Sequence, residues 1–229
     1  MNDATYETNE TNEPSELLTF TQRAFSRRGF LVGTGVTGAA VVAASRLGGV
    51  AGAGTTAGSA RPAQSGANND AATAAFAASL EVLAVNTYKA ALDAAQAGSL
   101  GPVPPAGAEF VTTAMAQHQA QLDKWNEVLT SAGAAPVTTP DPGLEQTVNG
   151  EFAKVTDFGG AATLARTLEE IAAATYLKAI PTLQSPDAIT LAGSINVVDM
   201  QHVAVLNFVL GEYPVPETFA KTDKAATPS

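Results

Sequence analysis

Apolar residues recur at helical spacing along four long segments of the chain. These segments are residues 70–97, 106–131, 160–183 and 187–210. Within each, positions three and four apart tend to be apolar, and alanine, the strongest helix former, fills many of the remaining positions. Asp70 is placed to cap the first helix and Gly98 to end it. The pattern predicts an all-α protein built from four helices.

The connections between these segments predict how the helices pair. Short turns rich in proline and glycine join the first helix to the second and the third to the fourth, so each pair should form an antiparallel hairpin. The connection between the second and third helices is much longer than a loop in a compact domain usually is. A long connection of this kind spans the length of a bundle, and residues 142–156 within it are expected to hold a short helix. The prediction is two hairpins joined by a long crossover.

The first and third helices carry the same sequence phrase. "LEVLAVNTYKAAL" aligns with "LEEIAAATYLKAI", which pairs Glu81 with Glu169 and Tyr88 with Tyr176. The tyrosine follows the glutamate by almost two helical turns in both copies, so the two side chains share a face. An ionised carboxylate on an apolar face is costly unless it is paired or binds a metal. Each glutamate is therefore either a metal ligand or a buried hydrogen-bond acceptor.

The second and fourth helices repeat a Gln-His pair. "MAQHQA" aligns with "DMQHVA", which pairs His118 with His202. Asp199 lies three residues before His202 on the same face, whereas Met115 holds the equivalent position before His118. The glutamines are expected to turn away from the histidines. Two glutamates and two histidines on four different helices predict an inward-facing cluster around a cation, although a hydrogen-bonded core histidine is the alternative for His118.

These phrases resemble the ferritin-like superfamily, and within it the exported branch that includes desiccation-related proteins. The resemblance implies a ferritin-like four-helix bundle over residues 70–211. It also implies a metal site with one glutamate on each of the first and third helices and a Glu-x-x-His pair on each of the others. Transferred to this chain, the implied metal ligands are Glu81, His118, Glu169, Asp199 and His202. Tyr88 and Tyr176 match tyrosines that hydrogen-bond to such ligands.

The chain departs from that pattern at two positions. Met115 stands where the family carries a glutamate, and Asp199 is one methylene shorter than glutamate. A thioether is a poor ligand for iron. The residues leave open one ion, an asymmetric pair of iron or manganese ions, or no metal. The matching functions are an oxidoreductase of ferroxidase or peroxidase type, or a non-catalytic stress or structural protein of the cell envelope.

The N-terminal region resembles an export signal. Arg27 and Arg28 stand after Ser26 and before a modestly apolar run, which is similar to a twin-arginine signal peptide. The similarity implies that residues 1–53 bring the chain to the twin-arginine export machinery and that the protein is periplasmic or extracellular. Small residues allow cleavage after Ala53 or Ala60.

Residues outside the bundle and the signal are expected to be linker and tail. Residues 54–69 are typical of a flexible linker and residues 212–229 of a C-terminal tail. The chain has a net charge of −10, which disfavours nucleic acid as a partner. It has no cysteine, which excludes disulfides, iron–sulfur clusters and zinc–thiolate sites. A homodimer formed through a helix face is left open.

Overall fold

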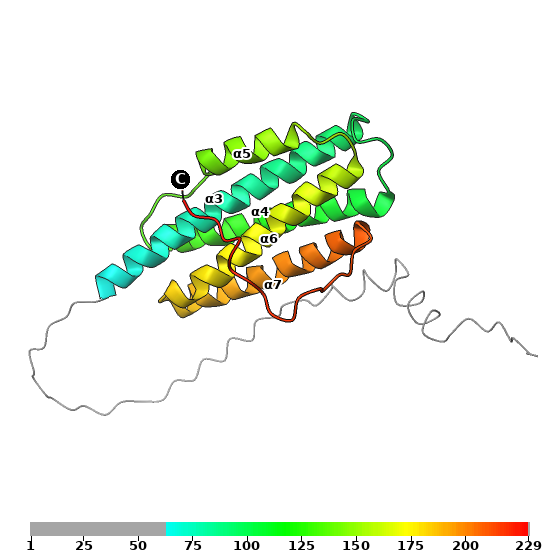
Figure 1. The fold of residues 1–229 in the computed structure, drawn as a ribbon. Coiled ribbons are helices and arrows are strands. Elements are labelled where there is room, and N and C mark those ends of the chain that lie inside the picture. Colours follow the sequence, from blue (N-terminus) through cyan, green and yellow to red (C-terminus); the bar gives the residue numbers. More distant parts are fainter. Residues whose placement is uncertain (1–62, 229) are drawn as a thin grey trace, which may run out of the picture. The chain divides into compact units, whose positions relative to one another are not determined.

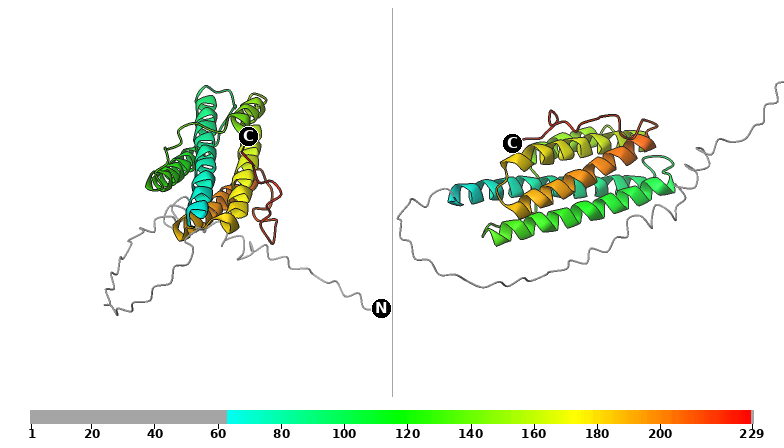
Figure 2. Two further views of the ribbon diagram at one scale, coloured as in Figure 1. Left: turned by 90° about the vertical axis from the view of Figure 1, so that its left-hand side faces the viewer. Right: turned by 90° about the horizontal axis from the view of Figure 1, so that it is seen from below.

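The computed structural model describes residues 63–228, which form helices and loops without any strand. The predicted signal peptide, including Arg27 and Arg28, lies outside the described residues. The elements in chain order are α3 (Ala63–Gln96), α4 (Pro105–Ser131), α5 (Pro142–Phe152), α6 (Phe158–Ala179), the short 3-10 helix η1 (Ile180–Thr182) and α7 (Pro186–Val209). The four long helices run alongside one another as a bundle (Figure 1; Figure 2). The predicted all-α bundle is confirmed.

The long helices form two hairpins. α3 packs chiefly against α4, and α6 packs chiefly against α7 (Figure 1). The crossover from α4 to α6 contains α5, so the expected short helix is present, and α5 lies against both α3 and α6. Asp141 starts α5 by accepting hydrogen bonds from the backbone N–H groups of Gly143 and Leu144, each at 3.1 Å. The crossover therefore covers one side of the bundle instead of hanging free.

The predicted start of the first helix was wrong. α3 begins at Ala63, inside the segment expected to be linker, and Asp70 lies within the helix. The Asp70 carboxylate instead accepts hydrogen bonds from the backbone N–H groups of Gln184 at 2.9 Å and Ser185 at 2.7 Å. It thereby satisfies donors at the turn that precedes α7. Asp70 therefore does accept backbone hydrogen bonds, but from residues 114 and 115 positions away in the sequence. No local sequence pattern reveals such a contact.

The apolar core fills one half of the bundle's length. Trp125 and Leu129 of α4 pack there with Tyr176 of α6 and Ile195 of α7. Small residues of α3 and α7 line the same region, including Ala78 and Ala192, which are both 0 % exposed. Small side chains let the helices approach closely around the large indole ring. By length and composition α7 could cross a membrane, a test that core helices of soluble proteins also pass.

The C-terminal tail lies along α6. The Lys224 ammonium lies 2.5 Å from the Glu170 carboxylate, and the Ala226 backbone N–H donates to the Thr175 hydroxyl at 2.8 Å. Near the end of α7 the Arg166 guanidinium lies 2.5 Å from the carboxylate of Glu212. Residues 212–228 thus run back over the outer surface of α6, and their side chains take no part in the cluster described next.

Candidate metal site

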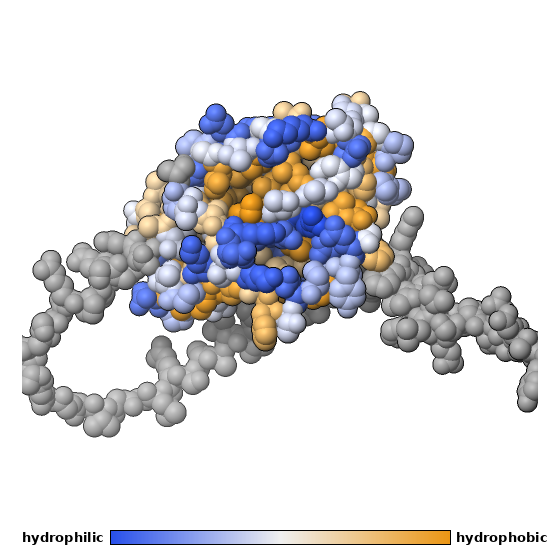
Figure 3. All heavy atoms as spheres, in the orientation of Figure 1, coloured by the Kyte–Doolittle hydropathy of each residue, from blue (hydrophilic) through white to orange (hydrophobic). Residues whose placement is uncertain are grey.

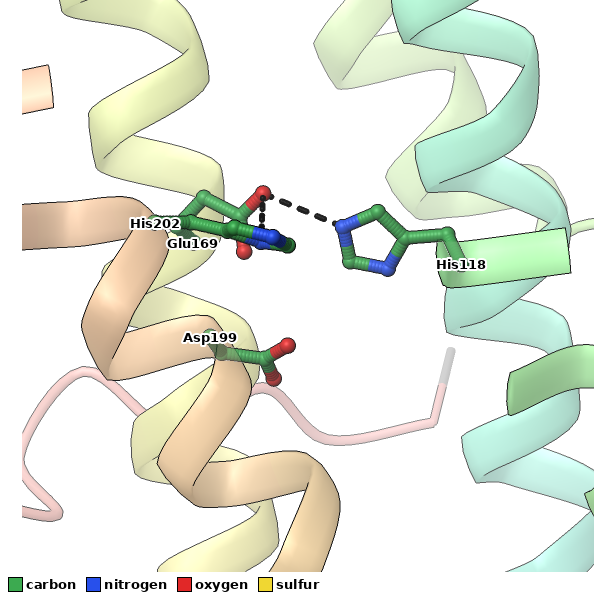
Figure 4. Close-up of side chains that lie close together, drawn as sticks. All are labelled: His118, Glu169, Asp199 and His202. Carbon is green, nitrogen blue, oxygen red and sulfur yellow. Dashed lines mark hydrogen bonds and ion pairs between the residues drawn. The ribbon is translucent and has the colours of Figure 1, made fainter. Parts of the chain in front are cut away.

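Four titratable side chains meet inside the bundle. His118 comes from α4, Glu169 from α6, and Asp199 and His202 from α7 (Figure 4). One donor atom from each lies within 4.8 Å of all the others. Ligand atoms bound to one transition-metal ion at about 2.1 Å are at most about 4.2 Å apart, so a small contraction would bring these four into coordination range. The structure thus gathers four of the five ligands that the resemblance implied.

The carboxylate of Glu169 is the centre of this cluster. Its Oε1 atom lies 3.0 Å from His118 Nε2 and 3.1 Å from His202 Nδ1. The Tyr88 hydroxyl donates to the same oxygen at 2.5 Å. Burial acts to raise the pKa of Glu169, but the nearby His118 and His202 outweigh it and lower that pKa to about 2. Glu169 is therefore ionised at neutral pH, and its Oε2 atom has no hydrogen-bond partner among the described residues.

Both histidines are held by their outer nitrogen atoms. His118 Nδ1 lies 2.7 Å from Glu81 Oε2, and His202 Nε2 lies 2.7 Å from Gln117 Oε1. Because these oxygens are acceptors, each outer nitrogen carries the proton and donates it. The inner nitrogens then face Glu169. Metal-binding histidines are held in this way in proteins, with the second ring N–H donated to a carboxylate or another oxygen.

The expectation that the glutamines turn away from the histidines was wrong for Gln117. Gln117 does point away from His118, its neighbour on α4, but this direction carries it to His202 on α7. Its repeat counterpart Gln201 is exposed on α7. The repeated Gln-His pair was the available signal, and it did not indicate which of the two glutamines contacts a histidine of the other hairpin.

Glu81 lies beside the four-residue cluster and contacts it through His118. It is 2 % exposed, and it also accepts a hydrogen bond from the Tyr176 hydroxyl. The tyrosines are therefore exchanged between the hairpins, since Tyr88 of α3 donates to Glu169 of α6 while Tyr176 of α6 donates to Glu81 of α3. Burial, and then the charge of its own glutamate partner, raises the pKa of each tyrosine. Direct ligation by Glu81 stays a prediction.

Asp199 is the least satisfied member of the cluster. It is 0 % exposed, and both of its carboxyl oxygens lack a hydrogen-bond partner among the described residues. Burial, followed by the charges of Glu169 and Glu81, raises its pKa well above the ordinary value, although His118 acts against this. A buried polar group without a partner is costly. A bound cation would supply a partner for both oxygens and favour the ionised form.

His118 carries a proton when no cation is present. Burial lowers the pKa of His118, but the charges and hydrogen bonds of Glu169 and Glu81 outweigh burial and raise that pKa well above its usual value. The imidazolium lies between two carboxylates as a buried ion pair on each side. A cation at the cluster would take the place of the proton on Nε2, so metal and proton compete for one position.

The donor set fits a divalent transition-metal ion. Two imidazole nitrogens and two carboxylates suit iron, manganese or zinc, and iron enzymes use related sets of two histidines and a carboxylate. Met115, at the position equivalent to Asp199, offers a thioether in place of a carboxylate, which is a poor ligand for iron. The residues that converge therefore provide for one ion more readily than for a pair.

Comparison with protein families agrees with this geometry. The family described as "Ferritin-like domain" matches residues 69–212, which is more than half of the chain. The chain belongs to the ferritin-like family. The match extends from α3 to the residues just beyond α7, and so includes every residue of the cluster. No curated protein matches the chain in a sequence search.

Two contacts at the site had no sequence signal. Phe110 of α4 packs its ring edge-on against His202, with ring centroids 5.6 Å apart. Trp125 donates its indole N–H to the Tyr176 hydroxyl at 2.9 Å and stacks on that ring. Aromatic residues at helical spacing are ordinary core residues, so the pattern alone gives no reason to connect them to the polar cluster.

Proposed function

We propose that this ferritin-like protein is exported and binds one Fe(II) or Mn(II) ion at His118, Glu169, Asp199 and His202. The observation that carries the proposal is Asp199, a fully buried carboxyl with no hydrogen-bond partner among the described residues and with three further donors around it. Export rests on the Arg27–Arg28 pair and its flanking sequence. Iron and manganese are preferred over zinc because the fold family implies redox metals.

The residues of the site would have distinct roles in binding the metal ion. Glu169 and Asp199 supply negative charge, and the two histidines supply neutral nitrogen ligands once His118 has lost its extra proton. Glu81 and Gln117 hold the two imidazole rings in place from outside. A bound iron or manganese ion would supply one-electron redox chemistry, which is the basis for proposing an oxidoreductase of ferroxidase or peroxidase type. The surrounding helices keep bulk water from the site, since each of the four residues is at most 6 % exposed.

The test is the metal content of the purified protein. We expect close to one equivalent of metal after reconstitution with Fe(II) or Mn(II), and almost none in the double variant His118→Ala/His202→Ala. Gln201→Ala is the matched control, because Gln201 is the exposed neighbour of His202 on the same helix. A native protein that holds no metal, and whose melting temperature does not respond to Fe(II), Mn(II) or Zn(II), would overturn the proposal.

A second candidate is a non-catalytic envelope or stress protein that kept the bundle and lost the metal. Two observations favour it: Met115 replaces an expected ligand, and α7 exposes apolar side chains, with Val197 55 % and Val209 39 % exposed. Such a surface would support a homodimer through a helix face. Light scattering on the metal-free protein separates the candidates, since a stable dimer without metal binding would favour this second function.

A further inference from the structure

An apolar cavity lies next to the metal site. It has a volume of about 260 Å³ and extends between α3, α4, α5 and α6, with contributions from the end of α7. Representative lining residues are Leu83, Ala91, Val111, Val148, Leu168 and Leu206. At its inner end the lining includes Tyr88, His118 and Glu169, so the cavity opens directly onto the cluster. For comparison, an engineered cavity of about 150 Å³ binds benzene.

The sequence keeps this space open. Alanines line both facing helices, among them Ala84 and Ala91 on α3 and Ala161 and Ala165 on α6. Protein cores ordinarily close such spaces with larger side chains, because unfilled volume lowers stability. The other half of the bundle is closed in that way around Trp125. The cluster therefore separates a packed half of the bundle from a hollow half.

The outer wall of the cavity is the crossover helix. Leu144, Val148 and Phe152 of α5 line it from the side that faces solvent. Hydrophobic surface is visible on the face of the molecule that carries α5 and α6 (Figure 3).

The apolar lining determines which guest fits. The lining residues named above are apolar, and at the inner end Tyr88 already donates its hydroxyl hydrogen to the Glu169 carboxylate. A guest with a carboxylate or an ammonium group would lose its hydration in an apolar cavity. We propose that the cavity binds an uncharged, chiefly apolar organic molecule, with one end against Glu169 and His118. This deepens the proposed function by naming a substrate class for the site, but binding itself does not require the metal.

Decanol is a suitable probe of this site. We expect calorimetry to show one decanol bound per chain in protein treated with chelator and in protein loaded with Mn(II). Decanoate should bind at least about tenfold more weakly, because its carboxylate would lose its hydration in the apolar cavity. Intermolecular nuclear Overhauser effects should connect the decanol chain to the methyl groups of Ala91 and Leu206. Absence of decanol binding, or tighter binding of decanoate than of decanol, would overturn the proposal.

Cavity-filling variants locate the binding site. Ala91→Leu should weaken decanol binding at least about tenfold, since the added atoms occupy the space of the guest. Ala161→Leu tests the opposite wall, and Ala72→Leu is the control because Ala72 is exposed on the same helix as Ala91. Melting curves show which variants are folded. Native affinity in both folded cavity variants would contradict this site, whereas the metal content, measured separately, decides the metal proposal.

Discussion

The two hairpins of the bundle carry the same set of polar residues with one exchange. The α3/α4 hairpin provides Glu81, Tyr88 and His118, and the α6/α7 hairpin provides their counterparts. The difference is at the position three residues before each histidine, which is Met115 in one hairpin and Asp199 in the other. The structure gathers Asp199 into the cluster, whereas Met115 has no carboxylate to contribute.

The difference between Met115 and Asp199 shows which of the two carboxylates can be replaced at little cost to stability. A thioether needs no hydrogen-bond partner, so a methionine in place of a carboxylate costs the bundle little. A buried carboxyl without a partner does cost stability, and Asp199 is one. The presence of Asp199 is therefore best explained by a cation that its carboxylate binds. Substitutions in the two hairpins should accordingly have unequal effects on metal binding.

The largest effect is expected from removing the retained acid. Asp199→Leu should reduce metal affinity by more than about 100-fold, because a ligand is lost where weaker outer contacts already contribute about 10- to 100-fold. The same change should stabilise the metal-free protein by about 1–3 kcal/mol, since an unpartnered buried carboxyl is removed. Metal titration and urea denaturation measure the two effects. Met115→Leu is the control, and a similar loss of affinity there would contradict the proposed asymmetry.

The pH dependence of metal binding should be steep. His118 and Asp199 both have raised pKa values in the metal-free protein, so metal binding should release protons. Affinity should then fall as pH decreases, by about 100-fold per pH unit over the range in which both groups are protonated. Calorimetry in two buffers with different ionisation enthalpies counts the protons. Binding without proton release would show that the metal does not replace the proton on His118.

Without metal, the stability should respond to pH in a definite direction. The raised pKa of His118 contributes stability that is fully present below its unfolded pKa of about 6.5 and is lost as pH rises through the folded value. The lowered pKa of Glu169 contributes stability above its unfolded pKa, which is lost as pH falls towards about 2. The metal-free protein should therefore lose stability above neutral pH, whereas the affinity for metal should increase there. Urea denaturation across pH checks both trends.

Restoring the missing acid should change the stoichiometry. Met115→Glu gives the α3/α4 hairpin the carboxylate that the family pattern carries, so the protein should bind two ions in place of one. Without metal, the same variant should be less stable by about 1–3 kcal/mol, because it places a further carboxyl beside the existing ones. Elemental analysis after reconstitution measures the ratio of metal to chain. A ratio unchanged from the native protein would mean that the two hairpins differ by more than this residue.

The two glutamines should differ in effect although their sequence contexts match. Gln117→Ala removes the acceptor that holds His202 and should weaken metal binding about tenfold. Gln201→Ala should leave the affinity unchanged, because Gln201 is not a hydrogen-bond partner of either histidine among the described residues. Competition with a chromophoric chelator resolves a difference of this size. Equal effects of the two substitutions would contradict the role given to Gln117.

The smallest difference is expected between the exchanged tyrosines. Tyr176→Phe leaves both Glu81 and the indole N–H of Trp125 short of a partner, and should cost about 1–3 kcal/mol. Tyr88→Phe removes a donor from a carboxylate oxygen that His118 also contacts, and should cost about 1 kcal/mol. Urea denaturation compares the two variants. A larger loss from Tyr88→Phe would reverse the order expected from the hydrogen bonds.

The fold could be predicted from the sequence because the patterns that indicate helices and turns are local and recur along the chain. Helical spacing, breakers and hairpin turns each depend on residues close together in the chain. The start of α3 did not follow, because Asp70 resembles a helix cap while its carboxylate serves Gln184 and Ser185. That contact depends on how the hairpins dock, which no local pattern specifies.

The sequence predicted which residues make up the candidate site, but not how their side chains contact one another. The repeat and the spacing around each histidine were sufficient to single out Glu169, Asp199 and both histidines. They could not assign Glu81 to the outer side of His118 or Gln117 to His202, because both depend on how the side chains of neighbouring helices are directed. The cavity was hidden for the same reason, since alanines in a helix indicate close packing and an open space equally well.

The most direct test is a crystal structure of the protein grown with Mn(II), with anomalous diffraction recorded to locate the metal. We expect a single peak coordinated by His118, Glu169, Asp199 and His202, with Glu81 still bonded to the outer nitrogen of His118. Two peaks, or one peak on Glu81 and remote from Asp199, would contradict the asymmetric single-ion site. Absence of any peak in the cluster would contradict metal binding itself.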